Sequence, residues 1–178
     1  MNWRLAVAIT RDRGWLLLVL VVVFALCLRG VTALITHPDQ MALLPLFKEG
    51  LAPFNPGWFE KPPFHTYTNY FLAVWPAETA ASALSLSNEH RDLLILVWSR
   101  QVSIALYLGS LTLFYLLVRR TFGSFTAGLL TTPLATSAGL IAHVHFLTAD
   151  IPMIAWMMVA FYFSHLPKSV LPSALSAS

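Results

Sequence analysis

Long apolar runs separated by short polar segments are the feature that most constrains this sequence. The run from Gly14 to Ile35 is close to the roughly 20 residues needed to cross the hydrocarbon of a bilayer, and Leu93 to Val118 is longer. With 57% hydrophobic residues, 11% charged residues and a mean hydropathy of +0.69, the 178-residue chain differs from soluble domains, where roughly a quarter of residues are charged. The composition predicts a membrane protein.

Four apolar segments are predicted to be transmembrane helices, so the expected fold class is all-α and integral to the membrane. The first is a possible signal peptide, but its apolar run exceeds the usual ~7–15 residues and no clear cleavage site follows it, which favours an uncleaved helix. The fourth is short for a span. The predicted spans are 14–35, 93–118, 125–147 and 151–166, in a transmembrane region of residues 1–168, followed by a disordered tail at 169–178.

Charges flanking the first two spans predict the orientation of the chain. Arg4, Arg11 and Arg13 precede the first span, and Arg119 and Arg120 follow the second. Basic residues favour the cytoplasmic side, so the N-terminus is predicted to be cytoplasmic and the acidic loop 36–92 to lie on the outer face.

The outer loop is predicted to contain one or two helices of its own. A short or kinked helix is expected within 37–50, and a second helix is expected from Pro62, with an apolar stripe that lies in the membrane interface. Thr68 and Asn69 fall outside this stripe, and Pro76 is expected to end the helix. The stripe consists of Phe64, Tyr67, Phe71, Val74 and Trp75.

Several classes of function are disfavoured by what the sequence lacks. No basic stripe with interleaved aromatic residues suggests nucleic-acid binding. Cys27 is the single cysteine, which excludes an intrachain disulfide, and its apolar surroundings predict a lipid-facing or packing role. His143 and His145 would point to different sides of a helix, which favours polar packing over a paired metal site.

Five short motifs occur in a defined order along residues 14 to 165. Their order resembles the N-terminal part of GT-C membrane glycosyltransferases, of the protein O-mannosyltransferase and lipid A aminoarabinose transferase type. The motifs are Asp39-Gln40, Trp58-x-x-Lys61-Pro62-Pro63, Arg100, Arg119-Arg120-Thr121-Phe122-Gly123 and Thr148-Ala149-Asp150.

This resemblance implies transfer of a sugar from a polyprenyl-phosphate donor to a lipid or protein acceptor on the outer face of a bacterial inner (plasma) membrane. By the same resemblance, Asp39 is the catalytic base, while Lys61 and Arg100 bind the donor phosphate. Asp150 matches a carboxylate that holds a divalent metal ion of unspecified identity or orients the acceptor. Proximity to Lys61 makes His65 a candidate substrate contact.

Each of these residues also has a purely structural interpretation. Asp39 and Asp150 could be acids at helix starts, and Lys61 could be an interfacial anchor. Arg100 could extend to the outer interface, and His65 could lie on a solvated face.

Two departures from the family weaken the transferase interpretation. Asp39-Gln40 stands where the family has Asp-Glu, which weakens a paired-carboxylate or metal role there. Family members also continue through many more spans, so this chain is expected to be an N-terminal portion or truncated member that is inactive alone. The alternative is a small non-catalytic membrane protein or assembly subunit. A transporter is disfavoured because no helix pair broken by Gly or Pro is evident.

Overall fold

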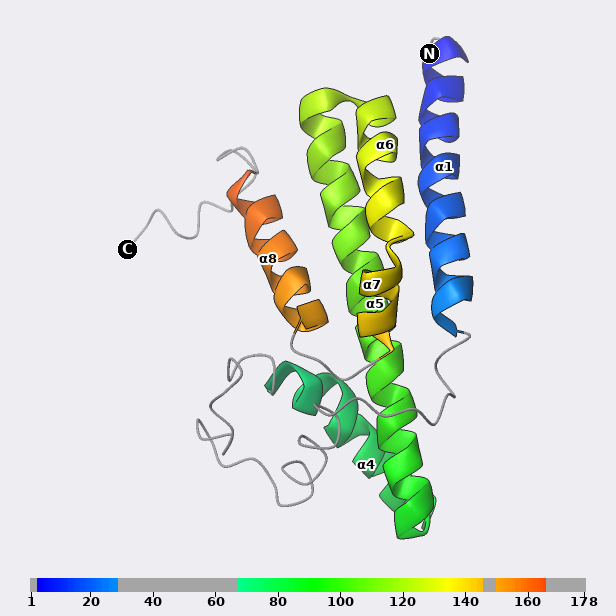
Figure 1. The fold of residues 1–178 in the computed structure, drawn as a ribbon, viewed down its shortest axis with the longest axis vertical. Helices are drawn as coiled ribbons and strands as arrows, with labels where there is room; N and C mark the ends of the chain where they lie inside the picture. Colours follow the sequence, from blue (N-terminus) through cyan, green and yellow to red (C-terminus); the bar gives the residue numbers. More distant parts are fainter. Residues whose placement is uncertain (1–2, 29–66, 146–149, 166–178) are drawn as a thin grey trace, which may run out of the picture.

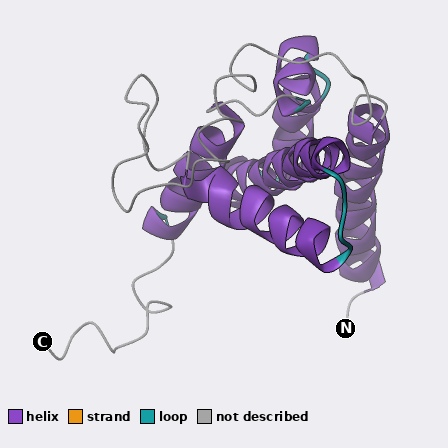
Figure 2. Ribbon diagram, turned by 90° about the horizontal axis from the view of Figure 1, so that it is seen from below, coloured by secondary structure: helices purple, strands orange, loops and turns teal. Residues whose placement is uncertain are grey.

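The protein is a bundle of helices arranged around one long helix, α5. The computed structural model describes residues 3–28, 67–145 and 150–165, and within these ranges Figure 2 shows helices and connecting loops but no strand. The predicted all-α class is therefore confirmed for the described part of the chain. The elements are α1 (Trp3–Leu28), η1 (Tyr70–Val74), α4 (Trp75–Ala83), α5 (Asn88–Phe122), α6 (Ser124–Ala135), α7 (Ala138–Val144) and α8 (Asp150–Ser164).

Helix α5 has charges that match its macrodipole. Glu89 lies in its first turn, and Arg119 and Arg120 lie in its last turn, where they oppose the partial charges of the helix ends. Gly123 follows with φ 84°, a backbone conformation that favours glycine, and the chain reverses there into α6.

The remaining helices pack around α5, as Figure 1 shows. Helix α6 and then α7 run back along α5 in the opposite direction, α1 packs on α5, α6 and α7, and α8 packs on α5. Five helices contribute side chains to one apolar core. Its buried members are Val23, Cys27, Ile104, Tyr107, Leu111, Ala135, Val144 and Ile151.

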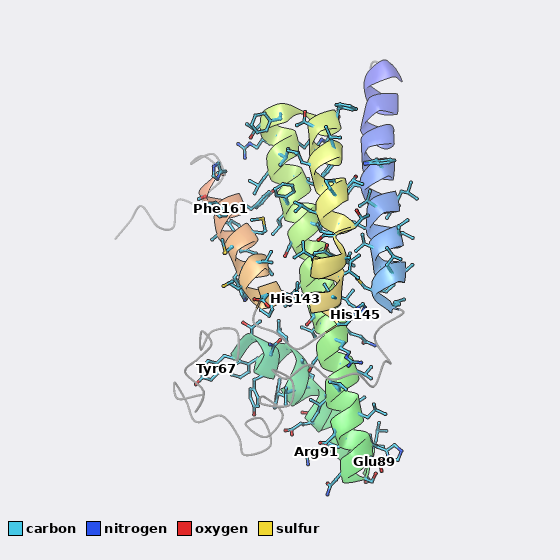
Figure 3. All side chains as sticks on the ribbon, in the orientation of Figure 1. Tyr67, Glu89, Arg91, His143, His145 and Phe161 are labelled. Atoms are coloured by element: carbon cyan, nitrogen blue, oxygen red, sulfur yellow. The ribbon has the colours of Figure 1, made fainter. Side chains whose placement is uncertain are left out.

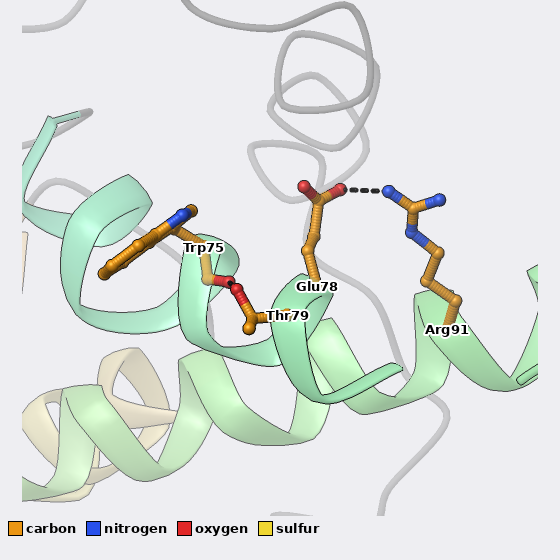
Figure 4. Close-up of polar contacts among 4 residues, drawn as sticks. All are labelled: Trp75, Glu78, Thr79 and Arg91. Atoms are coloured by element: carbon orange, nitrogen blue, oxygen red, sulfur yellow. Dashed lines mark hydrogen bonds and ion pairs between the residues drawn. The ribbon is translucent and has the colours of Figure 1, made fainter. Parts of the chain in front are cut away.

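Helix α4 forms a hairpin with the start of α5 and lies beside the lower part of α5 in Figure 1. Ala77 and Ala81 of α4 are buried, and such small side chains let packed helices approach closely. An ion pair of 2.8 Å between Arg91 Nη2 and Glu78 Oε1 joins the two helices near their connection (Figure 4).

The turn that ends α4 is a Schellman motif built on a serine. Leu86 N–H donates to the carbonyl of Ala81, and Ser85 N–H donates to the carbonyl of Ser82. Ser85 has φ 52° and occupies the position at which glycine is usual. The backbone of Ser85 is therefore strained, because a residue with a Cβ rarely adopts this conformation.

The substitution Ser85→Gly is expected to stabilise the protein by about 1 kcal/mol, because it removes the left-handed strain of a residue that has a Cβ. Thermal unfolding in detergent micelles, followed by circular dichroism, measures the effect. The matched control is Ser82→Gly, which makes the same change within α4 and should destabilise by several tenths of a kcal/mol. A lower unfolding temperature for Ser85→Gly than for the wild type would contradict this account.

The helices only partly match the predicted spans. Helix α5 alone is long and apolar enough to cross a membrane within the described ranges, and α6 with α7 would be a second crossing if that bent pair is one span. Helix α8 and the Gly14–Leu28 part of α1 are shorter apolar helices. Helix α5 contains the predicted span 93–118 and extends beyond both of its ends, and α1 begins before residue 14. The predicted helix at 37–50 and the tail at 169–178 lie outside the described residues.

The third predicted span, 125–147, is not one continuous helix: α6 and α7 meet at a bend of 63°, so this segment is a broken span or a re-entrant loop. Pro133 supplies no N–H to the helix. The hydroxyls of Thr132 and Thr136 donate to carbonyls four residues earlier, a pattern that bends helices. Ser137 then has an extended backbone (ψ 116°) and begins α7. This is a broken helix of the kind that the sequence analysis did not find.

The prediction that Pro76 ends a helix is also wrong, because the helix continues to Ala83. The preceding turn, η1, is π-helical, and Trp75 N–H bonds to the carbonyl of Tyr70. Pro76 follows at the first turn of α4, where a missing N–H costs little. Phe71 and Trp75 of the predicted stripe are exposed, whereas Val74 is buried. Their place in the membrane interface stays a prediction.

Candidate functional site

A carboxylate and an imidazole meet where α7 ends and α8 begins. Asp150 Oδ2, in the first turn of α8, lies 3.2 Å from Nδ1 of His143, in the last turn of α7. Both side chains are 46% exposed, so the pair is reachable from outside the bundle. At this distance the two groups form an ion pair when the His143 imidazole is protonated.

A second histidine, His145, caps the end of α7 and contacts α1. His145 Nε2 lies 2.6 Å from the backbone oxygen of Cys27 in the last turn of α1. A carbonyl oxygen only accepts, so Nε2 of His145 carries the proton. That carbonyl is among the last of α1, which have no donor within their own helix. His145 therefore joins the end of α1 to α7, and Figure 3 labels both histidines at this level of the bundle.

Arg100 lies at the same level of the bundle, inside it. Tyr107 Oη donates to the carbonyl oxygen of Leu134 at 2.8 Å, which fixes the register between α5 and α6. Because these helices run in opposite directions, Arg100 on α5 comes level with α7. Its side chain is only 1% exposed, so Arg100 is enclosed within the protein.

Polar side chains are buried on α5 and in the turn before η1. Asn69 and Ser99 are fully buried and Ser103 nearly so, and within the described part of the chain none of their side-chain polar atoms has a hydrogen-bond partner. Trp156 Nε1 of α8 donates to Thr68 Oγ1 at 3.2 Å, which brings the residues before η1 against α8. Thr68 and Asn69 fall outside the predicted apolar stripe, yet both are buried. Buried polar groups without partners are rare in proteins and require an explanation.

The structure describes two of the five predicted site residues. Arg100 lies on α5 and Asp150 begins α8, and the register between α5 and α6 puts Arg100 near the level of α7. Asp39, Lys61 and His65 lie outside the described residues, so the roles predicted for them stay predictions. His143 was not predicted as a partner of Asp150. The available signal was its position just before the Thr148-Ala149-Asp150 motif.

His143 and Asp150 are the candidate metal ligands that the described part of the site brings together. Within residues 3–28, 67–145 and 150–165, no group of three or more His, Cys, Asp or Glu side chains could hold a metal ion. His143 and Asp150 supply two donors, and further ligands would have to come from outside these ranges.

Comparison with known proteins supplies no relative: no family model matches the chain, and neither curated proteins nor solved structures gave a match.

Proposed function

We propose that the chain is part of a multi-pass membrane glycosyltransferase that moves a sugar from a polyprenyl-phosphate donor to a lipid or protein acceptor on the outer face of a bacterial inner membrane. The observation that carries the proposal is the meeting of Asp150 with His143 at the level of Arg100. A carboxylate, an imidazole and a guanidinium at one end of an apolar bundle are typical of a functional site in a membrane protein.

The spacing of arginines along α5 supports the membrane part of this proposal. Arg100 and Arg119 are separated by an uncharged stretch of helix. At about 1.5 Å per residue this stretch is about 28 Å long, close to the ~30 Å hydrocarbon core of a bilayer. On this basis Asn88 to Arg100, together with α4, lies beyond the hydrocarbon on the outer side.

The directions of the helices support a cytoplasmic location for both the start of α1 and the end of α5. The start of α1, the end of α5 and the start of α6 lie toward one end of the bundle in Figure 1, and His143 and Asp150 lie toward the other end of α7 and α8. Basic residues therefore gather opposite the candidate site. This arrangement agrees with a cytoplasmic N-terminus and a site on the outer face.

In the proposed reaction the donor phosphate is the leaving group, and positive side chains stabilise it. The family resemblance gives this role to Lys61 and Arg100, gives the role of base to Asp39 and makes His65 a substrate contact. Arg100 is buried, so contact with a donor phosphate requires the surrounding helices to separate. Asp150 would orient the acceptor or contribute to a divalent metal site.

Transfer of radiolabelled sugar from polyprenyl-phosphate donors tests this function in membranes that contain the chain. The 178-residue chain, any longer version of it and an Asp39→Asn variant of each are compared. Transfer that disappears with Asp39→Asn supports both the reaction and the base role of Asp39. No transfer by any version, despite stable membrane insertion, would favour the alternative of a non-catalytic membrane protein or assembly subunit.

A further inference from the structure

We infer that the turn between α5 and α6 binds anionic phospholipid headgroups at the cytoplasmic face of the membrane. The lipid-binding surface consists of Arg119 and Arg120, in the last turn of α5, and of Phe122 and Phe125, on either side of Gly123. The inference rests on the proposed function only for the placement of the chain in a membrane. The surface lies at the end of the bundle opposite the candidate site.

The positive charge at this turn is accessible and is not neutralised by nearby carboxylates of the same helices. Arg120 is exposed and Arg119 is partly exposed. The sequence has no acidic residue between Asp92 and Asp150, so neither the later part of α5 nor α6 carries a carboxylate. Arginine presents a planar set of N–H donors that fits the oxygens of a phosphate group. The turn is therefore complementary to an anionic phosphate.

Helix α1 brings further arginines to the same end of the bundle. Helices α1 and α6 run in the same direction in Figure 1, and a Cβ at Gly128 would lie 3.1 Å from Nε1 of Trp15, so these two residues are level. Counting back along both helices puts the stretch Arg11-Asp12-Arg13 level with the start of α6. Clusters of basic residues next to a membrane span attract anionic lipids.

Exposed apolar side chains continue from the arginines onto the outer side of α6. Phe125 is 84% exposed and Phe122 is 67% exposed. Leu129 is exposed as well, and it follows Phe125 by four residues, so the two lie on one face of α6. Basic residues beside large apolar side chains are typical of surfaces at the boundary between headgroups and acyl chains. A lipid contacts both parts of this surface, whereas a soluble acidic partner would match the arginines alone.

The depth of the turn in the membrane also fits a lipid headgroup. The uncharged stretch of α5 between Arg100 and Arg119 is about 28 Å long, close to the ~30 Å hydrocarbon core, so Arg119 emerges at the level of the lipid phosphates. The chain reverses at Gly123, and α6 then leads back along α5 into the hydrocarbon. Phe125 and Leu129 are thus placed to contact the acyl chains of a lipid whose phosphate lies at the arginines.

Fluorescence quenching by brominated lipid tests this surface in phosphatidylcholine vesicles that contain the full chain. The variant Phe125→Trp places a reporter at the turn, and the quenching of the wild type in the same vesicles is subtracted. Brominated phosphatidylglycerol should quench the reporter more strongly than the same fraction of brominated phosphatidylcholine does. In this background Arg119→Gln and Arg120→Gln should each lower the preference for phosphatidylglycerol by up to about fivefold.

Two further variants are matched controls for charge and position. Arg91 lies near the start of α5, at the opposite end of the bundle, and pairs with Glu78. The substitution Arg91→Gln should therefore leave the lipid preference at the turn unchanged. The variant Arg120→Lys keeps the positive charge and should keep most of the preference that Arg120→Gln loses. Circular dichroism verifies that each variant is as helical as the wild type.

The outcomes separate this inference from the proposed function. Equal quenching by the two lipids would overturn the inference and leave the transferase proposal standing, as would a preference that survives Arg119→Gln and Arg120→Gln together. Loss of the preference on addition of inorganic phosphate, at constant ionic strength, would assign the arginines to a soluble phosphate and would also overturn it. Without quenching by either lipid, both the inference and the membrane placement in the proposed function are overturned.

Discussion

Replacing Arg100 with alanine is expected to destabilise the protein by about 3–5 kcal/mol, the largest effect of any single substitution considered. Arg100 has the largest fully buried side chain among the described residues, with 1% of its surface exposed. Its removal leaves a cavity in the packed interior and takes a positive charge from it. Thermal unfolding in detergent, or unfolding in a mixed-micelle titration, measures the loss.

Arg91 provides a matched control on the same helix. Its side chain is 40% exposed and pairs with Glu78, and exposed ion pairs contribute little, so Arg91→Ala should cost less than about 1 kcal/mol. The variant Arg100→Met separates the effect of lost side-chain volume from the effect of lost charge on stability, because methionine fills most of the space with an apolar chain. Similar losses of unfolding free energy for Arg91→Ala and Arg100→Ala would show that the burial of Arg100 does not make it important for stability.

The sequence predicted helices better than it predicted where they break. The uncharged run from Gln101 to Val118 is long and ends on two arginines, so local composition was enough to find α5. The bend between α6 and α7 depends on tertiary contacts as well. The carbonyl of Leu134 at this bend accepts a hydrogen bond from Tyr107, which is distant in sequence. No pattern within the sequence of α6 and α7 identifies Tyr107 as this partner.

The candidate site was only partly accessible to sequence reasoning for a similar reason. Asp150 stood out because an acid between apolar runs is unusual. Its pairing with His143 depends on the geometry of the short connection from α7 to α8, which sequence spacing does not specify. The burial of Asn69 depends on packing around the hairpin of α4 and α5, and sequence amphipathicity gave the opposite expectation. Prediction therefore failed where contacts between helices determine the environment of a side chain.

Gly128→Leu is expected to destabilise the packing of α1 against α6 by about 1–3 kcal/mol, through overpacking at one contact. A Cβ at Gly128 would lie 3.1 Å from Nε1 and 3.2 Å from Cδ1 of Trp15, closer than the ordinary separation of about 3.5–4.0 Å. The indole of Trp15 would have to move away from α6. In the described part of α1 only Val23 and Cys27 are buried, so few other contacts oppose its displacement.

A double-mutant cycle shows whether the Trp15 contact causes this loss. In a Trp15→Ala background the space beside Gly128 is free, so Gly128→Leu should cost much less than it does in the wild type. Gly109→Leu is the matched control, because a Cβ at Gly109 meets no atom within 4 Å and glycine is a poor helix former, so this substitution should be neutral or stabilising. If Gly128→Leu costs the same in both backgrounds, the contact with Trp15 does not determine the effect. A large coupling would instead establish that Gly128 is required for the close approach of α1 to α6, and hence for the position of the α1 carbonyl that His145 binds.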